Sequence, residues 1–217
     1  MSGVTQATFM NQRSFGGPPP GAIGTSYQGG FYAGQIGVSS AATHYLVIAP
    51  LSSGQSTLAW KNAQTDTTGA DSDINGPQNT ADMVADGNST VYPAAHFCND
   101  ASIGGFTDWY MPAKNELEVC YFNLKPGTTA NNTYSPQGIN PNAVPARTSG
   151  YTSGNPAQTS AAAFQTGGAE AFVANKYWCS TELNTSDGRF QYFSDGGQYT
   201  YGKNLQFRVR AVRRVSV

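Results

Sequence analysis

The sequence predicts an α+β fold in which small twisted antiparallel sheets are combined with two or three helices and long loops. Three observations lead to this class. Apolar residues recur at helical spacing over residues 117–124, which indicates a helix with one apolar face. Apolar and polar residues alternate over residues 205–211, as they do in a half-buried strand. Between these patterns, residues 125–170 hold several prolines and asparagines without a sustained period, which indicates a long irregular insert.

The composition indicates a single domain with few charges. A chain of 217 residues is long enough to bury a sizeable core, and its charged fraction of 12% is about half the usual share. The net charge of -1 offers no attraction to nucleic acid or anionic lipid. No apolar run approaches the roughly 20 residues that cross a bilayer, and the first residues lack the basic and apolar stretches of a secretory signal. We expect a loop-rich surface that recognises neutral partners.

The first thirty residues differ from the rest of the chain. Residues 16–21 are all glycine or proline, and aliphatic periodicity is almost absent before Phe31. Proline-rich segments extend as semi-rigid spacers and become ordered by packing on a neighbour. We therefore divide the chain into an attachment or oligomerisation segment, residues 1–30, and a binding domain, residues 31–217. A free tail is the alternative interpretation of the segment.

A buried strand and a long loop are expected next. The run His44–Pro50 is apolar, rich in β-branched and aromatic residues and bounded by turn formers, so it predicts a strand in the centre of a sheet. The stretch Ser52–Gly76 mixes small polar residues around a lone Trp60 and predicts a long loop or an irregular hairpin. Its aspartates lack the spacing and the closing glutamate of a calcium loop, so we predict no metal site.

Two short helices should follow the loop. Asn79 or Thr80 is expected to cap the first helix, which ends at Gly87. The second helix begins after Pro93 and carries Phe97 on its apolar side. We expect both helices to cover one side of the core.

A tight turn leads into the third helix. Gly104 and Gly105 can adopt backbone angles closed to other residues, and the fixed angle of Pro112 suits a first helical turn. Glu116 would lie near the helix N-terminus, where the macrodipole favours a carboxylate. We expect this helix to run from Pro112 to Leu124, where a Lys-Pro-Gly run follows.

The insert contains aromatic residues among small polar ones. Tyr134, Arg147 and Tyr151 lie in such surroundings, a composition also found in antibody loops. They form a possible second contact surface. The alternative is a surface excursion that packs on its own domain.

The last part of the chain predicts a hairpin followed by one more strand. Residues 189–193 lead into the turn Ser194–Gly197, whose Asp-Gly pair suits a hairpin connection, and residues 198–201 continue beyond it. In residues 205–211 the apolar positions should face the core, and the alternating Gln and Arg positions should form a polar face.

The cysteines and histidines form no recognisable catalytic or metal motif. The spacing of Cys98, Cys120 and Cys179 matches no zinc template, so we interpret them as small buried hydrophobes. A Cys98–Cys120 bridge is possible, although a chain made in the cytosol is expected to keep its thiols reduced. His44 and His96 lie in no nucleophile motif. We predict no enzymatic activity and no cofactor.

Three segments resemble the signature of bacterial and phage domains that have a C-type-lectin-like fold: Gly104–Leu117, Tyr177–Glu182 and Val209–Arg214. Related groups include the Lcl C-terminal type and the formylglycine-generating enzymes, whose cysteine pair is not matched because this chain has only Cys179 in that region. The resemblance implies that Trp109 and Trp178 lie in the core. It also implies that Arg210 and Arg213 hydrogen-bond loops that cross the sheet.

Residues 29–34 and the Asn-Pro-rich insert near residue 140 look like parts of phage tail-fibre proteins. This resemblance implies a fibre tip that is part of the virion, is assembled in the host cytoplasm, and binds a glycan or protein on the bacterial surface. A homotrimer is expected, because fibres are commonly threefold. The alternative is a structural virion protein that joins or caps fibre or baseplate components. By resemblance, the expected ligand-binding residues are Asp187, Arg189, Gln191, Tyr199, Tyr201, Lys203 and Asn204.

Overall fold

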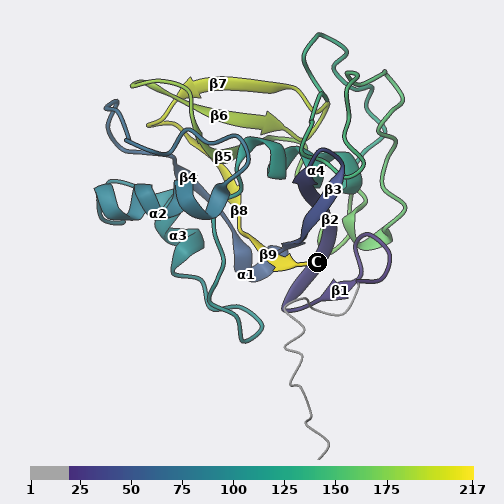
Figure 1. The fold of residues 1–217 in the computed structure, drawn as a ribbon, viewed down its shortest axis with the longest axis horizontal. Coiled ribbons are helices and arrows are strands. Elements are labelled where there is room, and N and C mark those ends of the chain that lie inside the picture. The colour runs from purple at the N-terminus through teal and green to yellow at the C-terminus, as the bar shows by residue number, and fades with distance from the viewer. Residues whose placement is uncertain (1–19) are drawn as a thin grey trace, which may run out of the picture.

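The computed structural model describes residues 20–217, which form a mixed helix and sheet structure dominated by two curled sheets (Figure 1). The first sheet has the strand order β1-β2-β3-β9 and is antiparallel throughout. Its strands are β1 (Ser26–Tyr27), β2 (Gly30–Val38), β3 (Ala41–Ile48) and β9 (Val212–Ser216). The second sheet has the order β4-β8-β5-β6-β7, with one parallel pair, β5 and β8. Its strands are β4 (Gln55–Ala59), β5 (Lys176–Glu182), β6 (Asp187–Tyr192), β7 (Gln198–Gly202) and β8 (Gln206–Arg210).

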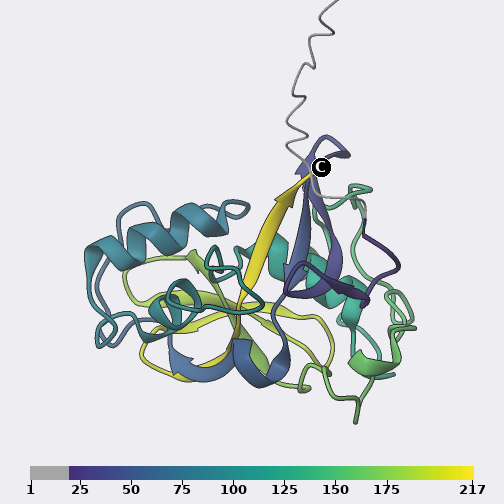
Figure 2. The same cartoon turned by 90° about the horizontal axis from the view of Figure 1, so that it is seen from below.

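The helices lie on both sides of these sheets. They are α1 (Leu51–Gly54), α2 (Gly76–Asp86), α3 (Pro93–Asn99), α4 (Lys114–Leu124) and the 3-10 turn η1 (Ala162–Phe164). Helix α4 packs against β2, β5 and β6, whereas α2 and α3 pack on each other and reach β5 and β4. Figure 2 shows the pair α2 and α3 on one side of the molecule and the β2–β3 hairpin on the other. Among the described residues, no helix is long and apolar enough to span a membrane.

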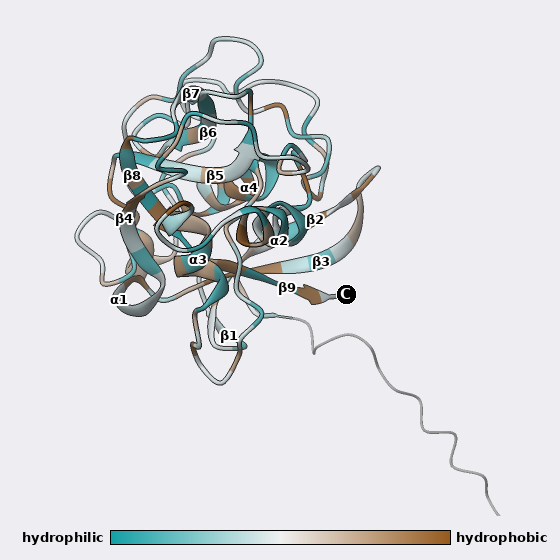
Figure 3. Cartoon of the chain, turned by 90° about the vertical axis from the view of Figure 1, so that its left-hand side faces the viewer, coloured by the Kyte–Doolittle hydropathy of each residue, from teal (hydrophilic) through white to brown (hydrophobic). Residues whose placement is uncertain are grey.

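The two sheets are joined by consecutive strands near the C-terminus. Strand β8 ends at Arg210 in the second sheet, and β9 begins at Val212 in the first. The buried Ala211 between them donates its N–H to Gly54 O and accepts from Ala49 N–H, both at 2.9 Å. Figure 3 shows hydrophobic and hydrophilic residues alternating along β8. The alternating Gln and Arg positions form the expected polar face, but this face is not all open to solvent, because Arg210 is buried as completely as Val209.

Several sequence predictions are confirmed. Strand β3 lies between β2 and β9, in the interior of its sheet. Strands β6 and β7 form the expected hairpin, and Gly196 in its turn has a φ of 78°. Trp109 and Trp178 are buried, as expected. Trp60, for which no burial was predicted, is buried too, and each of the three indole N–H groups donates to a backbone oxygen.

Two helix starts differ from the prediction. Helix α4 begins at Lys114, two residues after Pro112, because the Glu116 carboxylate accepts the N–H of Ala113 at 2.8 Å and closes the first turn there. Helix α2 begins at Gly76 with Asn75 as its cap.

The residues expected to cap α2 are inside it instead. Asn79 donates to Ser72 O at 2.8 Å and so holds the preceding loop, whereas Thr80 donates to Gly76 O, also at 2.8 Å, within the first turn of the helix. The expected end of this helix at Gly87 is confirmed. The expected loop Ser52–Gly76 is irregular after Trp60 but contains β4 before it.

The expected attachment segment falls partly outside the described residues. Nothing is described for residues 1–19, whereas β1 in the remainder pairs with β2. The expected domain start at Phe31 falls within β2, which begins at Gly30. Attachment by this segment stays a prediction.

Candidate binding surface

One face of the second sheet carries a row of aromatic side chains that runs from the core to the surface. Trp178 is paired with Phe190, and Phe190 is paired with Tyr199, so the three side chains lie on the same face of neighbouring strands. Exposure rises along this row: Trp178 is fully buried, Phe190 is 5% exposed and Tyr199 is 44% exposed. Tyr201, two residues further along β7, is 51% exposed. The surface tyrosines therefore stand on a buried aromatic base.

Ring contacts hold these aromatic residues in place. The ring centroids of Trp178 and Phe207 are 4.4 Å apart in a stacked arrangement, and those of Phe207 and Tyr201 are 6.0 Å apart, edge to face. The ammonium of Lys176 lies 4.7 Å from the Phe207 ring centre and 5.2 Å from that of Tyr201. Such contacts restrict the rings before any ligand arrives, so less conformational entropy is lost on binding.

The insert is tied to the turn end of this hairpin (Figure 1). Asn132 donates its backbone N–H to Asp195 O at 2.8 Å and its side-chain amide to the Tyr199 hydroxyl. Partial burial and the Asp195 carboxylate raise the pKa of Tyr199, so its hydroxyl stays protonated at neutral pH. Tyr134 follows in the same loop and is 80% exposed. We call Tyr134, Tyr199 and Tyr201 the tyrosine surface.

A hollow of about 430 Å³ adjoins Tyr201 at the outer edge of β7. It offers amide, hydroxyl and carboxylate groups together with one aromatic ring, and its lining residues are Gln64, Asp187, Thr200, Tyr201, Gly202, Asn204 and Leu205. Hydrogen-bonding groups beside an exposed ring suit a polar ligand with some apolar area.

The expected ligand-binding residues differ in their exposure. Tyr199, Tyr201 and Asn204 are exposed and Asp187 is partly exposed, so these four side chains are available to a ligand. Arg189 is partly exposed, but its Nε is buried, and its pairing with Thr200 places it on the opposite face of the sheet from Tyr199. Gln191 and Lys203 are buried and are not available to a ligand.

Their burial has a clear cause. Gln191 is 1% exposed and donates to Gly196 O at 3.2 Å inside the hairpin turn. Lys203 is fully buried, forms an ion pair with Glu182 and donates to the backbone oxygens of Thr65 and Thr185, each at 2.9 Å. Both predictions are corrected: these side chains bind the protein's own loops.

The possible second contact surface is also only partly available. Tyr151 is 5% exposed and donates its hydroxyl to Glu118 at 2.6 Å. Arg147 forms an ion pair with the same buried carboxylate and stacks on Phe122, 4.0 Å from the ring centre. Burial lowers the pKa of Arg147 to about 10. Of the three residues expected there, only Tyr134 points to solvent.

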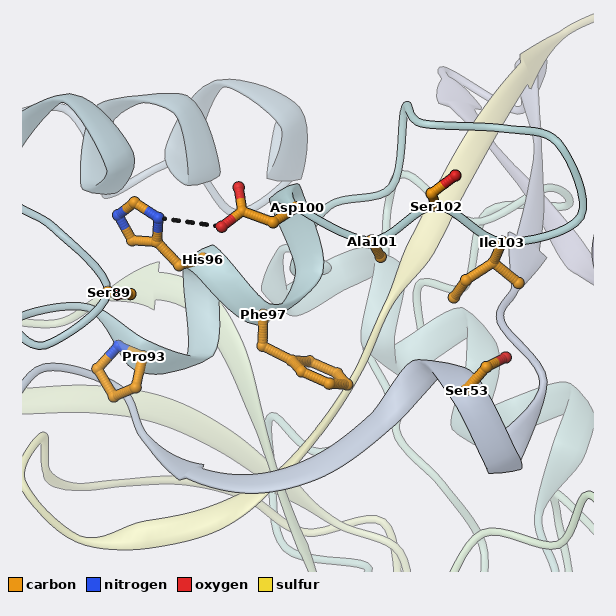
Figure 4. Close-up of a pocket in the computed structure, with 9 residues that line it drawn as sticks. All are labelled: Ser53, Ser89, Pro93, His96, Phe97, Asp100, Ala101, Ser102 and Ile103. Carbon is orange, nitrogen blue, oxygen red and sulfur yellow. Dashed lines mark ion pairs between the residues drawn. The ribbon is translucent and has the colours of Figure 1, made fainter.

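A second hollow, of about 500 Å³, lies beside α3 (Figure 4). His96 and Asp100 form one side of it, with Nδ1 and the carboxylate 3.5 Å apart, and Phe97 forms its floor. The other ring nitrogen of His96 lies 2.8 Å from Gly87 O. Because both nitrogens are engaged, His96 is not free to activate a serine of this hollow, and the arrangement offers no nucleophile with a base.

The cysteines are structural in this fold. Cys98, Cys120 and Cys179 are free and buried, as expected for small hydrophobes, and the possible Cys98–Cys120 bridge is not formed. Burial raises the pKa of the Cys120 thiol to about 12 and that of Cys179 to about 11, so neither is a thiolate at neutral pH. Across residues 20–217, no group of three or more His, Cys, Asp or Glu side chains is placed to hold a metal ion.

Two buried arginines secure the loops around the sheets, as the sequence resemblance implied. Arg210 donates to Ala49 O and Glu170 O, each at 2.8 Å. Arg213 forms a bidentate pair with the Asp108 carboxylate at 2.7 and 2.8 Å. Neither guanidinium is available to a ligand, because both are at most 6% exposed.

The fold and surface describe a mostly β domain with curled sheets, buried tryptophans in the signature segments and an exposed tyrosine surface. The family model of the Lcl C-terminal domain matches residues 52–213. Because this match covers most of the chain, the chain belongs to the Lcl C-terminal domain family.

More distant comparisons add little. The structure is similar to a crystal structure of a fimbrial protein from Bacteroides ovatus ATCC 8483, with a TM-score of 0.45 and 13% sequence identity. The similarity covers 84% of this chain and 43% of that chain, so this chain spans less than half of the fimbrial protein's length. It is too remote to assign a function. A comparison with curated proteins finds no match.

Proposed function

We propose that this chain is a non-enzymatic adhesin, the tip of a phage tail fibre, which binds a glycan or a protein on the bacterial host surface through the tyrosine surface. In this proposal the domain is of the C-type-lectin-like type, is part of the virion and acts outside the cell. Membership of the Lcl C-terminal domain family is compatible with the proposal but does not identify the receptor.

The single observation that carries the proposal is the exposure of tyrosines on a buried aromatic base. Tyr134, Tyr199 and Tyr201 are between 44% and 80% exposed. Tyrosine offers a large apolar ring and a polar hydroxyl at low entropic cost, which suits sugar rings and mixed protein surfaces. Asp187 and Asn204 lie at the adjoining hollow and can hydrogen-bond hydroxyl or amide groups.

The mechanism is surface complementarity strengthened by several copies. Each contact of this kind is weak, because the exposed groups exchange water for ligand with small net gain. Linked copies raise avidity by about 100-fold or more without new contacts. A homotrimer, the usual symmetry of fibres, would supply such copies.

The absence of catalysis is part of the proposal and has support in the geometry. His96 is held by Asp100 and a backbone oxygen, and the buried thiols have raised pKa values. These arrangements favour recognition over bond breaking.

A structural virion role is the alternative. The partly exposed Val38 and Ile74 line a hollow with Arg214 near the turn end of the β2–β3 hairpin, on the other sheet from the tyrosine surface. Such a surface suits a joint to another fibre or baseplate protein. In that case the tyrosine surface would be dispensable for binding cells.

The test replaces Tyr199 and Tyr201 with alanine together and measures binding of the purified protein to susceptible cells. Binding should weaken by about tenfold or more, since two aromatic contacts are lost. The free energy of unfolding should change by no more than about 2 kcal/mol, less than for a core aromatic, because about half of each side chain is exposed. Val38→Ala, a truncation of an equally exposed side chain on the other sheet, is the matched control and should bind normally.

Two outcomes would contradict the proposal. Unchanged cell binding by the double variant would place the contact elsewhere. Binding to another virion protein without binding to cells, lost in Val38→Ala, would favour the joint.

A further inference from the structure

The outer edge of β7 is one of the two edges of the second sheet, because β7 stands at one end of the strand order and β4 at the other. In an antiparallel ladder, residues alternately bond to the partner strand and point their N–H and C=O away from it. Two hydrogen bonds, one at each end of the hairpin, show which residues bond across it. Tyr192 N–H donates to Gly197 O at 2.8 Å, and Lys203 N–H donates to Ser186 O at 3.0 Å. The backbone groups that face away from β6 therefore belong to Gln198, Thr200 and Gly202.

A side-chain amide already pairs with the first of these residues. Gln137 accepts Gln198 N–H through Oε1 at 2.6 Å and donates through Nε2 to Gln198 O at 3.1 Å. A primary amide presents the same donor and acceptor as a peptide group, so Gln137 occupies the place of one residue of a neighbouring strand. The edge is therefore built to accept amide partners in ladder geometry.

The next positions along this edge remain open. Gly202 O accepts the N–H of Leu205 at 3.1 Å, but in residues 20–217 no partner is found for Thr200 N–H, Thr200 C=O or Gly202 N–H. The hollow of about 430 Å³ that includes Thr200, Tyr201 and Gly202 in its lining gives a strand room to approach. Three unsatisfied backbone groups face this space.

We propose that an extended peptide segment of a partner protein adds to this edge as a sixth strand. The peptide residue opposite Thr200 exchanges two backbone hydrogen bonds with it. Gly202 N–H donates a third hydrogen bond, to a carbonyl oxygen of the peptide. The exposed rings of Tyr199 and Tyr201 flank one face of the added strand and contact its alternate side chains. Affinity then comes mainly from the main chain, and selectivity from those side chains.

A second copy of the chain is a poorer occupant than a peptide. Two β7 strands paired about Thr200 would place Gly202 of each copy opposite Gln198 of the other. The Gln137 amide already fills that place, so it closes the edge to a full β7 while leaving Thr200 and Gly202 accessible. A peptide avoids this conflict because it can turn away at Gln137. The inference goes beyond the proposed attachment function, since it requires neither a cell surface nor a glycan.

The test uses the full chain labelled with ¹⁵N and a panel of soluble hexapeptides in which threonine alternates with valine, leucine or tyrosine between terminal lysines. Titration should shift the amide signals of Thr200 and Gly202 most. Thr200→Pro removes the outward N–H without breaking a bond to β6, and proline is tolerated on edge strands. It should weaken binding by about tenfold, whereas Thr200→Val, the matched control with an intact N–H, should stay within about twofold of the wild type.

Peptides methylated on backbone nitrogen provide a second test that needs no protein variant. Two peptides are compared, one methylated at its odd-numbered residues and one at its even-numbered residues. One of these two methylation phases should abolish binding and the other should preserve it, because only every second amide faces β7. This pair decides the question if Thr200→Pro does not fold, which the melting temperature will show.

The inference is overturned if no peptide of the panel shifts these amides, if Thr200→Pro binds as well as Thr200→Val, or if both methylation phases act alike. A wild-type dimer in sedimentation that is lost in Thr200→Pro would identify a second copy as the occupant instead. Loss of cell binding in the double tyrosine variant is measured separately, so the failure of one proposal is distinguishable from the failure of the other.

Discussion

The tyrosine surface and the cluster around Arg147 and Tyr151 are built from similar residues, but the first is exposed and the second is buried. Tyr199 is 44% exposed on the hairpin, whereas Tyr151 is 5% exposed in the insert. Both lie among small polar residues in a chain with few charges. The difference comes from Glu118, a carboxylate on α4 that is fully buried.

A buried carboxylate requires hydrogen-bond donors, because transfer of an unpaired charge from water is very unfavourable. The insert supplies three of them: the Asn140 amide and the Tyr151 hydroxyl, each at 2.6 Å, and the Arg147 guanidinium. The polar residues of the insert thus supply the hydrogen bonds that the Glu118 carboxylate on α4 requires. Within residues 20–217, no buried carboxylate takes a hydrogen bond from Tyr199 or Tyr201, so they remain available to an external partner.

The largest effect is expected from a substitution in the insert. Arg147→Ala leaves Glu118 buried without its charged partner, and we expect the free energy of unfolding to fall by about 3 kcal/mol in urea denaturation. Tyr134→Ala, in the same insert but with an 80% exposed side chain, is the control and should change stability by less than about 0.5 kcal/mol. A loss below about 1 kcal/mol in Arg147→Ala would mean that the cluster is not needed for folding and that Arg147 is available for contact after all.

A smaller effect is expected at the hairpin end, where Lys203 is buried against Glu182. Lys203→Met should lower stability by about 2 kcal/mol, since Glu182 and two backbone oxygens lose their donor. Burial already raises the pKa of Glu182, and Lys203 opposes that rise, so the variant should raise this pKa further.

The pH dependence of Lys203→Met follows from that direction. A carboxyl whose folded pKa lies above its unfolded value loses its contribution to stability as the pH rises through the folded pKa. The cost of the substitution should therefore be smaller at pH 5 than at pH 8, measured by urea denaturation at both values. Lys176→Met, which removes an ammonium that contacts only ring faces, should show no such trend. An equal cost of Lys203→Met at both pH values would show that Glu182 does not titrate in this range.

Local patterns were sufficient for much of the fold. The apolar run at β3, the Asp-Gly turn between β6 and β7 and the apolar face of α4 depend on neighbours in sequence, and all three are found in the structure. The sequence also contains a signal for the start of α2, because Asn75 is followed by Gly76 and a proline, which is a helix-start pattern.

The site was less predictable because burial of polar residues depends on distant partners. Lys203 is held by Glu182 and by Thr65, which is 138 residues away from it in the chain. No local pattern marks such a pairing. For Gln191 a signal existed: it shares strand parity with the buried Phe193, which places both side chains on the face that packs toward α4.

The smallest expected effect concerns the link between the two regions. Gln137→Leu removes the two hydrogen bonds from the insert to Gln198, and stability should fall by only about 1 kcal/mol because the link lies at a sheet edge. The Gln198 amide should exchange with solvent about tenfold faster, whereas the amide of Tyr199, which bonds to β6, should keep its rate. Equal acceleration at both amides would mean that the insert supports the whole hairpin. With the Gln137 amide gone, the free edge would also extend from Gly202 back to Gln198, so this variant should form additional β7-to-β7 association beyond that of the wild type, as sedimentation would show.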